Sequence, residues 1–134
     1  MWPIYQGKTC MAKNVTFPDE TCTLGGYPTY SVNVSSVAQI QLALNFARNL
    51  DLRLVIKNTG HDYLGKSSGA GSLELWMHNL REIKYLPSYE TISYSGKAFK
   101  VDAGVTVQEI YRAADAHSTA VQGGICPVRS GRAL

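Results

Sequence analysis

The sequence has neither a long hydrophobic run nor an excess of charge of one sign. No apolar stretch approaches the roughly 20 residues that a helix needs to cross a bilayer, so we expect no membrane-spanning segment. The 13 basic and 10 acidic residues are scattered along the chain, and the net charge is only +3. Scattered charge is typical of a solvated surface and argues against a nucleic-acid-binding patch. Residues 1–5 show neither a basic start nor an apolar core, so no signal peptide is visible.

Cysteine and histidine are also scarce, at three residues each. Cys10 and Cys22 lie in a loop-like stretch with no histidine nearby, and their spacing does not suit paired zinc ligands, so we expect no metal site. The simplest arrangement is a disulfide between these two cysteines and a free thiol at Cys126. Two glycosylation sequons, at 14–16 and 33–35, agree with an oxidising secretory route. We therefore predict secretion or passage through the secretory pathway.

The chain of 134 residues is one domain's length at most, and its 45% apolar residues can supply a core. Residues 1–27 hold turn formers without periodicity and are predicted to form an N-terminal segment, followed by a domain over 28–134. A short strand is predicted at 30–34 and a buried strand at 53–57. Between them, Ser36 and Gln39 have the spacing of a capping box, which predicts a helix that runs to about Leu50.

The apolar residues of this helix recur at intervals of three and four, which predicts one buried face made by Val37, Ile40, Leu44 and Ala47. The order strand, helix, strand is that of a βαβ unit, which normally closes right-handed onto a parallel sheet.

The second half of the chain predicts more strands and a second helix. Alternation predicts strands at 72–76 and 98–102, with 91–94 as the hairpin partner of the latter. Thr106 and Glu109 form a second capping box, which predicts a helix through Ala114 and towards His117. Residues 120–122 have the pattern of a strand start. The class is therefore a mixed α and β fold.

The loop at 57–71, which reads Lys-Asn-Thr-Gly-His-Asp-Tyr-Leu-Gly-Lys-Ser-Ser-Gly-Ala-Gly, is the segment most suited to binding chemistry. Its glycines allow positive φ angles and close approach of the backbone to a ligand. Successive backbone N–H groups in such a turn form a concave anion site suited to a pyrophosphate. The hydroxyls of Thr59, Ser67 and Ser68 add donors. The loop is neither a Walker loop nor a Gly-x-Gly-x-x-Gly fingerprint, because the required residues and the following helix are absent.

Residue types and spacing alone leave the roles of single residues in this region open. His61 is equally an ordinary turn histidine that bonds to the backbone, and Asp62 is equally a turn residue that bonds to its own backbone. Cys126 is equally an ordinary buried cysteine.

The sequence Asn58-Thr59-Gly60-His61-Asp62-Tyr63-Leu64-Gly65 resembles the signature of FAD-linked oxidases of the vanillyl-alcohol oxidase and PCMH superfamily. It resembles in particular the berberine-bridge-enzyme-like group of fungi. In that family the motif's histidine, which matches His61, is bonded through a ring nitrogen to the 8α-methyl carbon of the flavin. Gly124-Ile125-Cys126-Pro127 resembles a downstream motif whose cysteine bonds to flavin C6 in bicovalent members. The similarity covers nearly the whole chain.

The resemblance implies an α+β fold, the N-terminal portion of a PCMH-type FAD-binding domain, with a small parallel-containing sheet, helices and a second antiparallel sheet. It implies an oxidoreductase in which an alcohol, sugar or secondary metabolite passes a hydride to covalently bound FAD and O2 is the final acceptor. The implied partners are this small-molecule substrate and O2, without nucleic acid or membrane. The implied cofactor-binding residues are Asn58, Thr59, Gly60, His61, Asp62, Tyr63, Leu64, Gly65, Ser67, Gly104, Gly124 and Cys126.

The last residues depart from the family pattern. After Pro127 the family continues with a glycine-rich run, whereas this chain reads Val-Arg-Ser-Gly-Arg-Ala-Leu and ends at Leu134. We therefore expect an FAD-binding domain truncated at its C-terminus, with the catalytic base and the substrate domain beyond Leu134. The alternative is a non-catalytic α/β domain without activity of its own, in which His61 and Cys126 are incidental.

Overall fold

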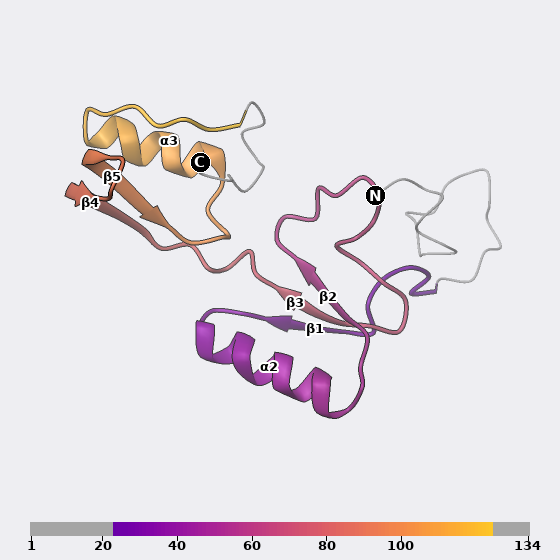
Figure 1. Cartoon of the computed structure of the whole chain (residues 1–134). Helices are drawn as coiled ribbons and strands as arrows, with labels where there is room; N and C mark the ends of the chain where they lie inside the picture. Colours follow the sequence, from indigo (N-terminus) through magenta and orange to yellow (C-terminus); the bar gives the residue numbers. More distant parts are fainter. Residues whose placement is uncertain (1–22, 125–134) are drawn as a thin grey trace, which may run out of the picture. The chain divides into compact units, whose positions relative to one another are not determined.

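A computed structural model describes residues 23–124. Contacts divide the chain into two compact units, one ending at Met77 and the other beginning at His78, which we call the N-terminal and C-terminal units (Figure 1). The predicted disulfide between Cys10 and Cys22 and the position of Cys126 lie outside the described residues. The division into a segment at 1–27 and a domain at 28–134 stays a prediction. Within the described range, neither helix is long and apolar enough to cross a membrane.

The N-terminal unit is built on a three-stranded parallel sheet in the order β1-β3-β2. Strand β1 (Tyr30–Asn33) leads through helix α2 (Val37–Asn49) to β2 (Leu54–Lys57), which confirms the predicted βαβ unit. Strand β3 (Leu73–Trp76) follows and inserts between them. The strands have only four residues each. The core lies at β3 because it is the central strand, and Leu75 on it is completely buried.

Two connections of opposite direction cover this sheet. Helix α2 carries the chain from β1 past the position of β3 to β2, and residues 58–72 carry it back from β2 to β3. Right-handed crossovers that run in opposite directions lie on opposite faces of a parallel sheet. Figure 1 shows α2 and the returning loop on different sides of the strands. The loop is therefore a crossover without a helix, and it covers the face that α2 leaves open.

Helix α2 begins where the capping residues predict, although only half of the capping box forms. The Ser36 hydroxyl accepts a hydrogen bond from the backbone N–H of Gln39 at 3.4 Å. The Gln39 side chain does not return to Ser36 but accepts from the backbone N–H of Ser35 at 2.8 Å. The reciprocal bond is thus displaced by one residue towards the N-terminus.

The predicted buried face of α2 is wrong in part. Ala43 and Ala47 are the buried residues of the helix, whereas Val37 and Leu44 are 64% and 42% exposed. Small side chains allow a helix to approach a sheet closely, and strands of four residues leave the larger flanking side chains without a partner surface among the described residues. The predicted buried strand at 53–57 is also only partly buried, because β2 is an edge strand of the sheet. Ile56 on this strand is 57% exposed.

The C-terminal unit contains an antiparallel pair, β4 (Ile83–Glu90) and β5 (Ser95–Val101), and helix α3 (Val107–Ala116). The prediction that 91–94 pairs with the later strand is wrong, because these residues form the turn, closed by a bond from Thr91 N to Tyr94 O at 2.7 Å. The sequence patterns did not predict strand β4, because Pro87 interrupts the alternation of its residues. The pairing register shifts between Leu86 and Tyr89, which accommodates a residue without an N–H.

Helix α3 confirms the second capping box in full. Glu109 N donates to the Thr106 hydroxyl at 3.4 Å, and the Glu109 carboxylate accepts from Thr106 N at 2.7 Å. The buried residues of the helix are Val107, Ile110 and Ala114. The predicted strand start at 120–122 is wrong, because residues 119–124 have no regular structure and no strand partner among the described residues.

Candidate functional site

The glycine-rich loop leaves the carboxyl end of β2, the edge of a parallel sheet at which ligands usually bind in α/β folds. Trp76, at the same end of β3, donates its indole N–H to the carbonyl of Asn58 at 3.1 Å and so ties the start of the loop to the sheet. Asp62 accepts from the backbone N–H of Lys66 at 3.1 Å. Asp62 therefore has the turn role that the sequence left open.

At Gly60 the loop combines a left-handed backbone conformation with a close side-chain neighbour. Its φ is +89°, and a Cβ atom there would lie 3.3 Å from Cδ of Lys57. The loop therefore needs glycine at this point both for its backbone conformation and for the close passage of the Lys57 side chain beneath it.

Beneath the loop lies an ion pair between a buried carboxylate and a half-buried lysine, which the sequence patterns did not predict. Glu74, in the centre of β3, is 2% exposed, and its Oε1 atom lies 3.0 Å from Nζ of Lys57. The same oxygen accepts from the Ser31 hydroxyl at 2.7 Å. The Lys57 ammonium lies 5.7 Å from the centroid of the Trp76 ring, within reach of a cation–π interaction. A buried carboxylate requires such partners, because desolvation of an unpaired charge costs several kcal/mol.

The pleat explains why these side chains meet. Ser31 and Glu74 are register partners in the parallel pair β1–β3, and Lys57 is the register partner of Trp76 in β2–β3. Because successive side chains alternate between faces, all of them project from one face of the sheet. We call this surface the polar face. A glutamate inside the apolar run Leu73-Glu74-Leu75 is a sequence signal for a buried carboxylate, although it does not identify the partners of that carboxylate.

A cavity of about 190 Å³ lies between the loop and the polar face. It is lined by Tyr27, Lys57, Thr59, Gly60, Asp62, Gly65, Ser67, Ser68 and Glu74. The structure thus brings five of the predicted cofactor residues together: Thr59, Gly60, Asp62, Gly65 and Ser67. His61, Tyr63 and Leu64 do not line the cavity and are exposed on the loop.

The ionisable side chains of the lining are Lys57, Asp62, Glu74 and Tyr27. Such a lining presents both donors and acceptors to a group that bears hydroxyls. FAD carries such hydroxyls on its ribityl chain and ribose, and the residues present fit that part of it. The anion-binding role of the loop's backbone N–H groups stays a prediction.

In the C-terminal unit, Gly104 lies in the turn that leads from β5 to α3. Its N–H donates to the carbonyl of Leu80 at 2.8 Å. A Cβ atom at this position would collide with the backbone carbonyl oxygens of His78 and Leu80. Close approach of two backbone segments therefore explains this glycine, and its predicted contact with the cofactor stays a prediction.

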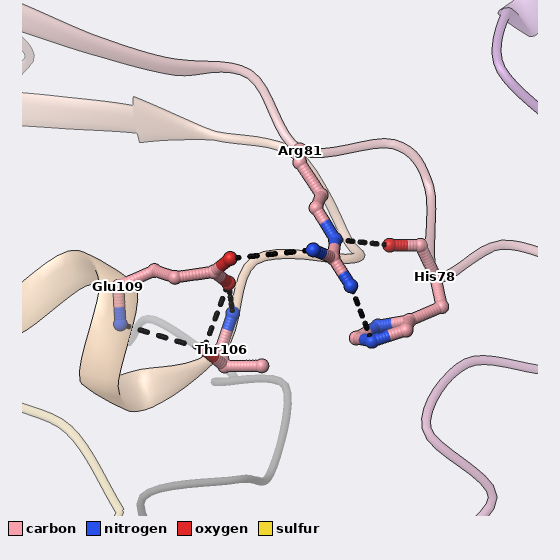
Figure 2. Close-up of polar contacts among 4 residues, drawn as sticks. All are labelled: His78, Arg81, Thr106 and Glu109. Carbon is pink, nitrogen blue, oxygen red and sulfur yellow. Dashed lines mark hydrogen bonds and ion pairs between the residues drawn. The ribbon is translucent and has the colours of Figure 1, made fainter.

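Figure 2 shows a polar network that joins the same segment to the start of α3. Arg81 donates from Nε to the carbonyl of His78 at 2.9 Å, and its Nη2 lies 2.6 Å from Nε2 of the His78 ring. Because a guanidinium only donates, Nε2 is the acceptor in this contact. Arg81 Nη1 lies 3.6 Å from the Glu109 carboxylate. The network fixes residues 78–81 against the first turn of α3.

The Thr106 backbone N–H holds the pKa of Glu109 below its ordinary value, and the Thr106 hydroxyl and the Arg81 charge act in the same direction. Partial burial opposes this shift without reversing it. The carboxylate is therefore ionised at neutral pH and serves as a structural acceptor rather than as a proton donor.

The same unit holds an apolar groove of about 790 Å³. It lies along β5 and α3 and includes Phe99, Val105, Ile110 and Val121. Gly124, one of the predicted cofactor residues, is exposed and accepts a 3.5 Å hydrogen bond from the Tyr111 hydroxyl. The expected convergence of His61 and Cys126 on one cleft involves a residue outside the described range and stays a prediction.

Comparison with protein families matches residues 28–128 to the family described as FAD binding domain. A VAO-type flavoprotein oxidase of Thermothelomyces thermophilus, VAO615, is 47% identical over 123 residues, which are 92% of this chain and 21% of the relative. An FAD-linked oxidoreductase of Phaeosphaeria nodorum, sthB, is 45% identical over 127 residues, or 95% of this chain and 39% of the relative.

The fold agrees with a solved structure of the same kind. The crystal structure of the VAO-type flavoprotein MtVAO615 from Myceliophthora thermophila C1 matches with a TM-score of 0.82 and 49% identity, over 84% of this chain and 21% of that chain. The expected PCMH-type FAD-binding fold is thereby confirmed. The chain spans about a fifth of the length of VAO615 and about two fifths of that of sthB.

Proposed function

Because the chain belongs to the family of FAD binding domains, we propose that it forms the N-terminal part of a flavoprotein oxidase and binds FAD through loop 58–71. The observation that carries this proposal is the crossover loop itself, which lines an open polar cavity at the carboxyl end of β2. When bound, FAD supplies two-electron chemistry: an alcohol loses a hydride and a proton to become a carbonyl, and O2 takes up two electrons and two protons as hydrogen peroxide.

The exposed imidazole of His61 supports a covalent link to the cofactor. His61 projects from the loop outside the cavity, so its ring nitrogen is accessible to a flavin ring placed over the loop. In the proposed link, a ring nitrogen of His61 would lose its proton and replace one hydrogen of the flavin 8α-methyl group, and the two electrons and two protons released would reduce O2 to hydrogen peroxide. Cys126 is the candidate for a second link at C6. This arrangement is the berberine-bridge-enzyme-like one that the motifs resemble.

The second candidate is a non-catalytic FAD-binding module. Both candidates bind flavin, and they differ in whether the bound flavin is reduced by an alcohol or sugar and whether O2 is then consumed. Anaerobic bleaching of the flavin absorbance by such a substrate supports the oxidase, and bleaching by dithionite alone supports the binding module.

We also propose that the protein passes through the secretory pathway. The sequon at 33–35 begins with an exposed asparagine at the end of β1, which is compatible with a glycan there. Cys10 and Cys22 are proposed to pair, and closure of a loop of this size contributes about 3 kcal/mol in the chain-entropy model. Expression through a eukaryotic secretory pathway, followed by glycosidase treatment and non-reducing peptide mapping, tests both points.

Titration of the chain with FAD, followed by quenching of the flavin fluorescence, tests the proposed function directly. We expect saturable binding with one FAD per chain. Gly60→Ala should weaken this binding about tenfold, because the +89° backbone angle becomes strained and Lys57 is displaced. Gln41→Ala, on the exposed surface of α2, is the matched control and should leave binding unchanged. Equal affinity of the Gly60→Ala and Gln41→Ala variants would contradict the assignment of the loop.

A further inference from the structure

The apolar groove of the C-terminal unit reaches both faces of strand β5. Its lining includes every residue from Lys97 to Val101, but only Leu86 and Tyr89 of β4. Because the side chains of a strand alternate between the two faces of its sheet, a groove lined by consecutive residues passes round an edge of that strand. Strand β4 covers one edge of β5, and no strand pairs with the other among residues 23–124. The groove therefore runs along the open edge of β5.

The register of the hairpin shows which backbone groups point towards this edge. Asp102 N donates to the carbonyl of Glu82 at 2.9 Å, so these opposite residues form a hydrogen-bonded pair. Hydrogen-bonded and non-hydrogen-bonded pairs alternate along an antiparallel ladder. Phe99 and Val101 stand at odd spacings from Asp102, so their N–H and C=O groups point away from β4. The open edge thus presents two donors and two acceptors in the spacing of a strand.

The wall that accompanies this edge is apolar. Val107 and Ile110 of α3 line the groove, and Val121 continues the wall beyond the helix. Unpaired backbone groups beside apolar pockets are the arrangement that receives an added strand, because main-chain hydrogen bonds give affinity and alternate side chains fill the pockets. A sheet of only two strands is marginally stable, which also favours a third.

Positive charge on the hairpin narrows the chemistry of such a strand. Lys84 and Lys100 are register partners, and like charges directly opposite each other destabilise a sheet. Both are exposed, and neither forms an ion pair within residues 23–124. The Phe99 ring lies 5.9 Å from that of His117 at the end of α3, so Lys100, the next residue, projects from the opposite face. A carboxylate on that face would offset the repulsion.

The same charges count against this chain as its own partner. The β5 edge of a second copy would bring two further lysines, Lys97 and Lys100, to the groove. Residues 125–134 contain Arg129 and Arg132 but no acidic residue. Charge complementarity therefore favours a strand from a different polypeptide.

We propose that the groove binds an extended segment of another protein, in which apolar side chains towards α3 alternate with acidic side chains towards Lys84 and Lys100. The segment pairs with the N–H and C=O groups of Phe99 and Val101, and β5 becomes the central strand of a three-stranded sheet. This surface lies in the C-terminal unit and is separate from the loop at 58–71.

Synthetic strands test the surface on the full chain in the absence of FAD. The probe is a labelled, capped peptide of about seven residues in which valine alternates with glutamate, and a valine–lysine peptide is its matched control. Fluorescence anisotropy should show saturable binding of the glutamate peptide and about tenfold weaker binding of the lysine peptide, because repulsion replaces attraction. Equal affinity for the two peptides, or no binding of either, overturns the proposal.

Methylated peptides test the backbone contacts. Only one of the two alternating sets of peptide N–H groups can face β5. N-methylation of that set should abolish binding, and methylation of the other set should leave it unchanged. Equal effects of the two sets would show that the peptide does not add as a strand.

A reversal of charge on the chain tests the specificity. Lys100→Glu should weaken the glutamate peptide and strengthen the lysine peptide, each about tenfold, and the fold is retained because a carboxylate there faces Lys84. Arg112→Glu, on the exposed side of α3 and outside the groove, has the same net charge and should leave both affinities unchanged.

An unchanged peptide preference of Lys100→Glu overturns the proposal. A dimer of the chain that excludes the peptide assigns the groove to a second copy and also overturns it. No outcome depends on FAD, so failure of these experiments leaves the function proposed for the loop at 58–71 standing.

Discussion

Thr106 joins the start of α3 to the acid one turn later through two reciprocal hydrogen bonds. Replacement of an N-cap threonine by alanine leaves a backbone N–H without its acceptor and typically costs about 1 kcal/mol. We expect Thr106→Ala to lower the free energy of unfolding by about this amount, measured by urea denaturation. Thr29→Ala, at an exposed position before β1, is the control and should have little effect. Equal losses for the two variants would show that the cap contributes nothing.

Glu109 gives the same helix start a dependence on pH. Its pKa is lower in the folded chain than the ordinary value of 4.5, so its stabilising effect is complete above that value and is lost as the pH falls through the folded pKa. We expect the difference in unfolding free energy between wild type and Glu109→Gln to be largest near neutral pH and to disappear in strong acid. Denaturation curves between neutral and acidic pH measure it. A difference that is constant with pH would contradict the role of the charge.

Single residues were predictable from the sequence where their partners are local. Ser36 and Thr106 were identified as caps because their acceptors and donors lie within four residues, and the turn role of Asp62 was one of two open alternatives. The Lys57–Glu74 pair was not predictable, because it depends on the register of two strands separated by a long loop. Sequence spacing carries no information on that register.

At the scale of elements, the turn between β5 and α3 depends on Gly104. A Cβ atom there meets backbone carbonyls, which cannot rotate away as a side chain can. We expect Gly104→Ala to lower the free energy of unfolding by about 1–3 kcal/mol, the usual cost of overpacking. Gly124→Ala serves as the control, because its Cβ would meet only a methyl group of Val107 at 4.0 Å. Thermal unfolding of both variants tests this, and an unaffected Gly104→Ala chain would contradict the close packing of the two backbone segments.

Elements were predicted well where periodicity was unbroken. Strand β1 and helices α2 and α3 follow their patterns and caps closely, whereas β4 was missed because Pro87 disrupts its alternation. The exposed side of α2 was misjudged for a different reason. Hydrophobic spacing reports which residues share a face, but the extent of a sheet of four-residue strands decides how many of them it can cover.

At the scale of the whole molecule, membership of the FAD binding domain family and the fold of the N-terminal unit point to the same loop. Five predicted cofactor residues line one cavity there. The sequence could suggest that these residues lie together, but it could not establish it. The motif at 58–65 was recognisable because it is contiguous. The polar face beneath it was not, since Ser31, Lys57 and Glu74 come from three different strands.

The location of FAD on this chain is best measured by amide hydrogen exchange with and without the cofactor. Backbone N–H groups that bind or are covered by FAD exchange more slowly, and peptides across the loop report on them directly. The account predicts that FAD slows exchange in residues 58–71 while that of the β4–β5 turn at 91–94 is unchanged. Saturation of the chain with FAD without any added protection at 58–71 would contradict it.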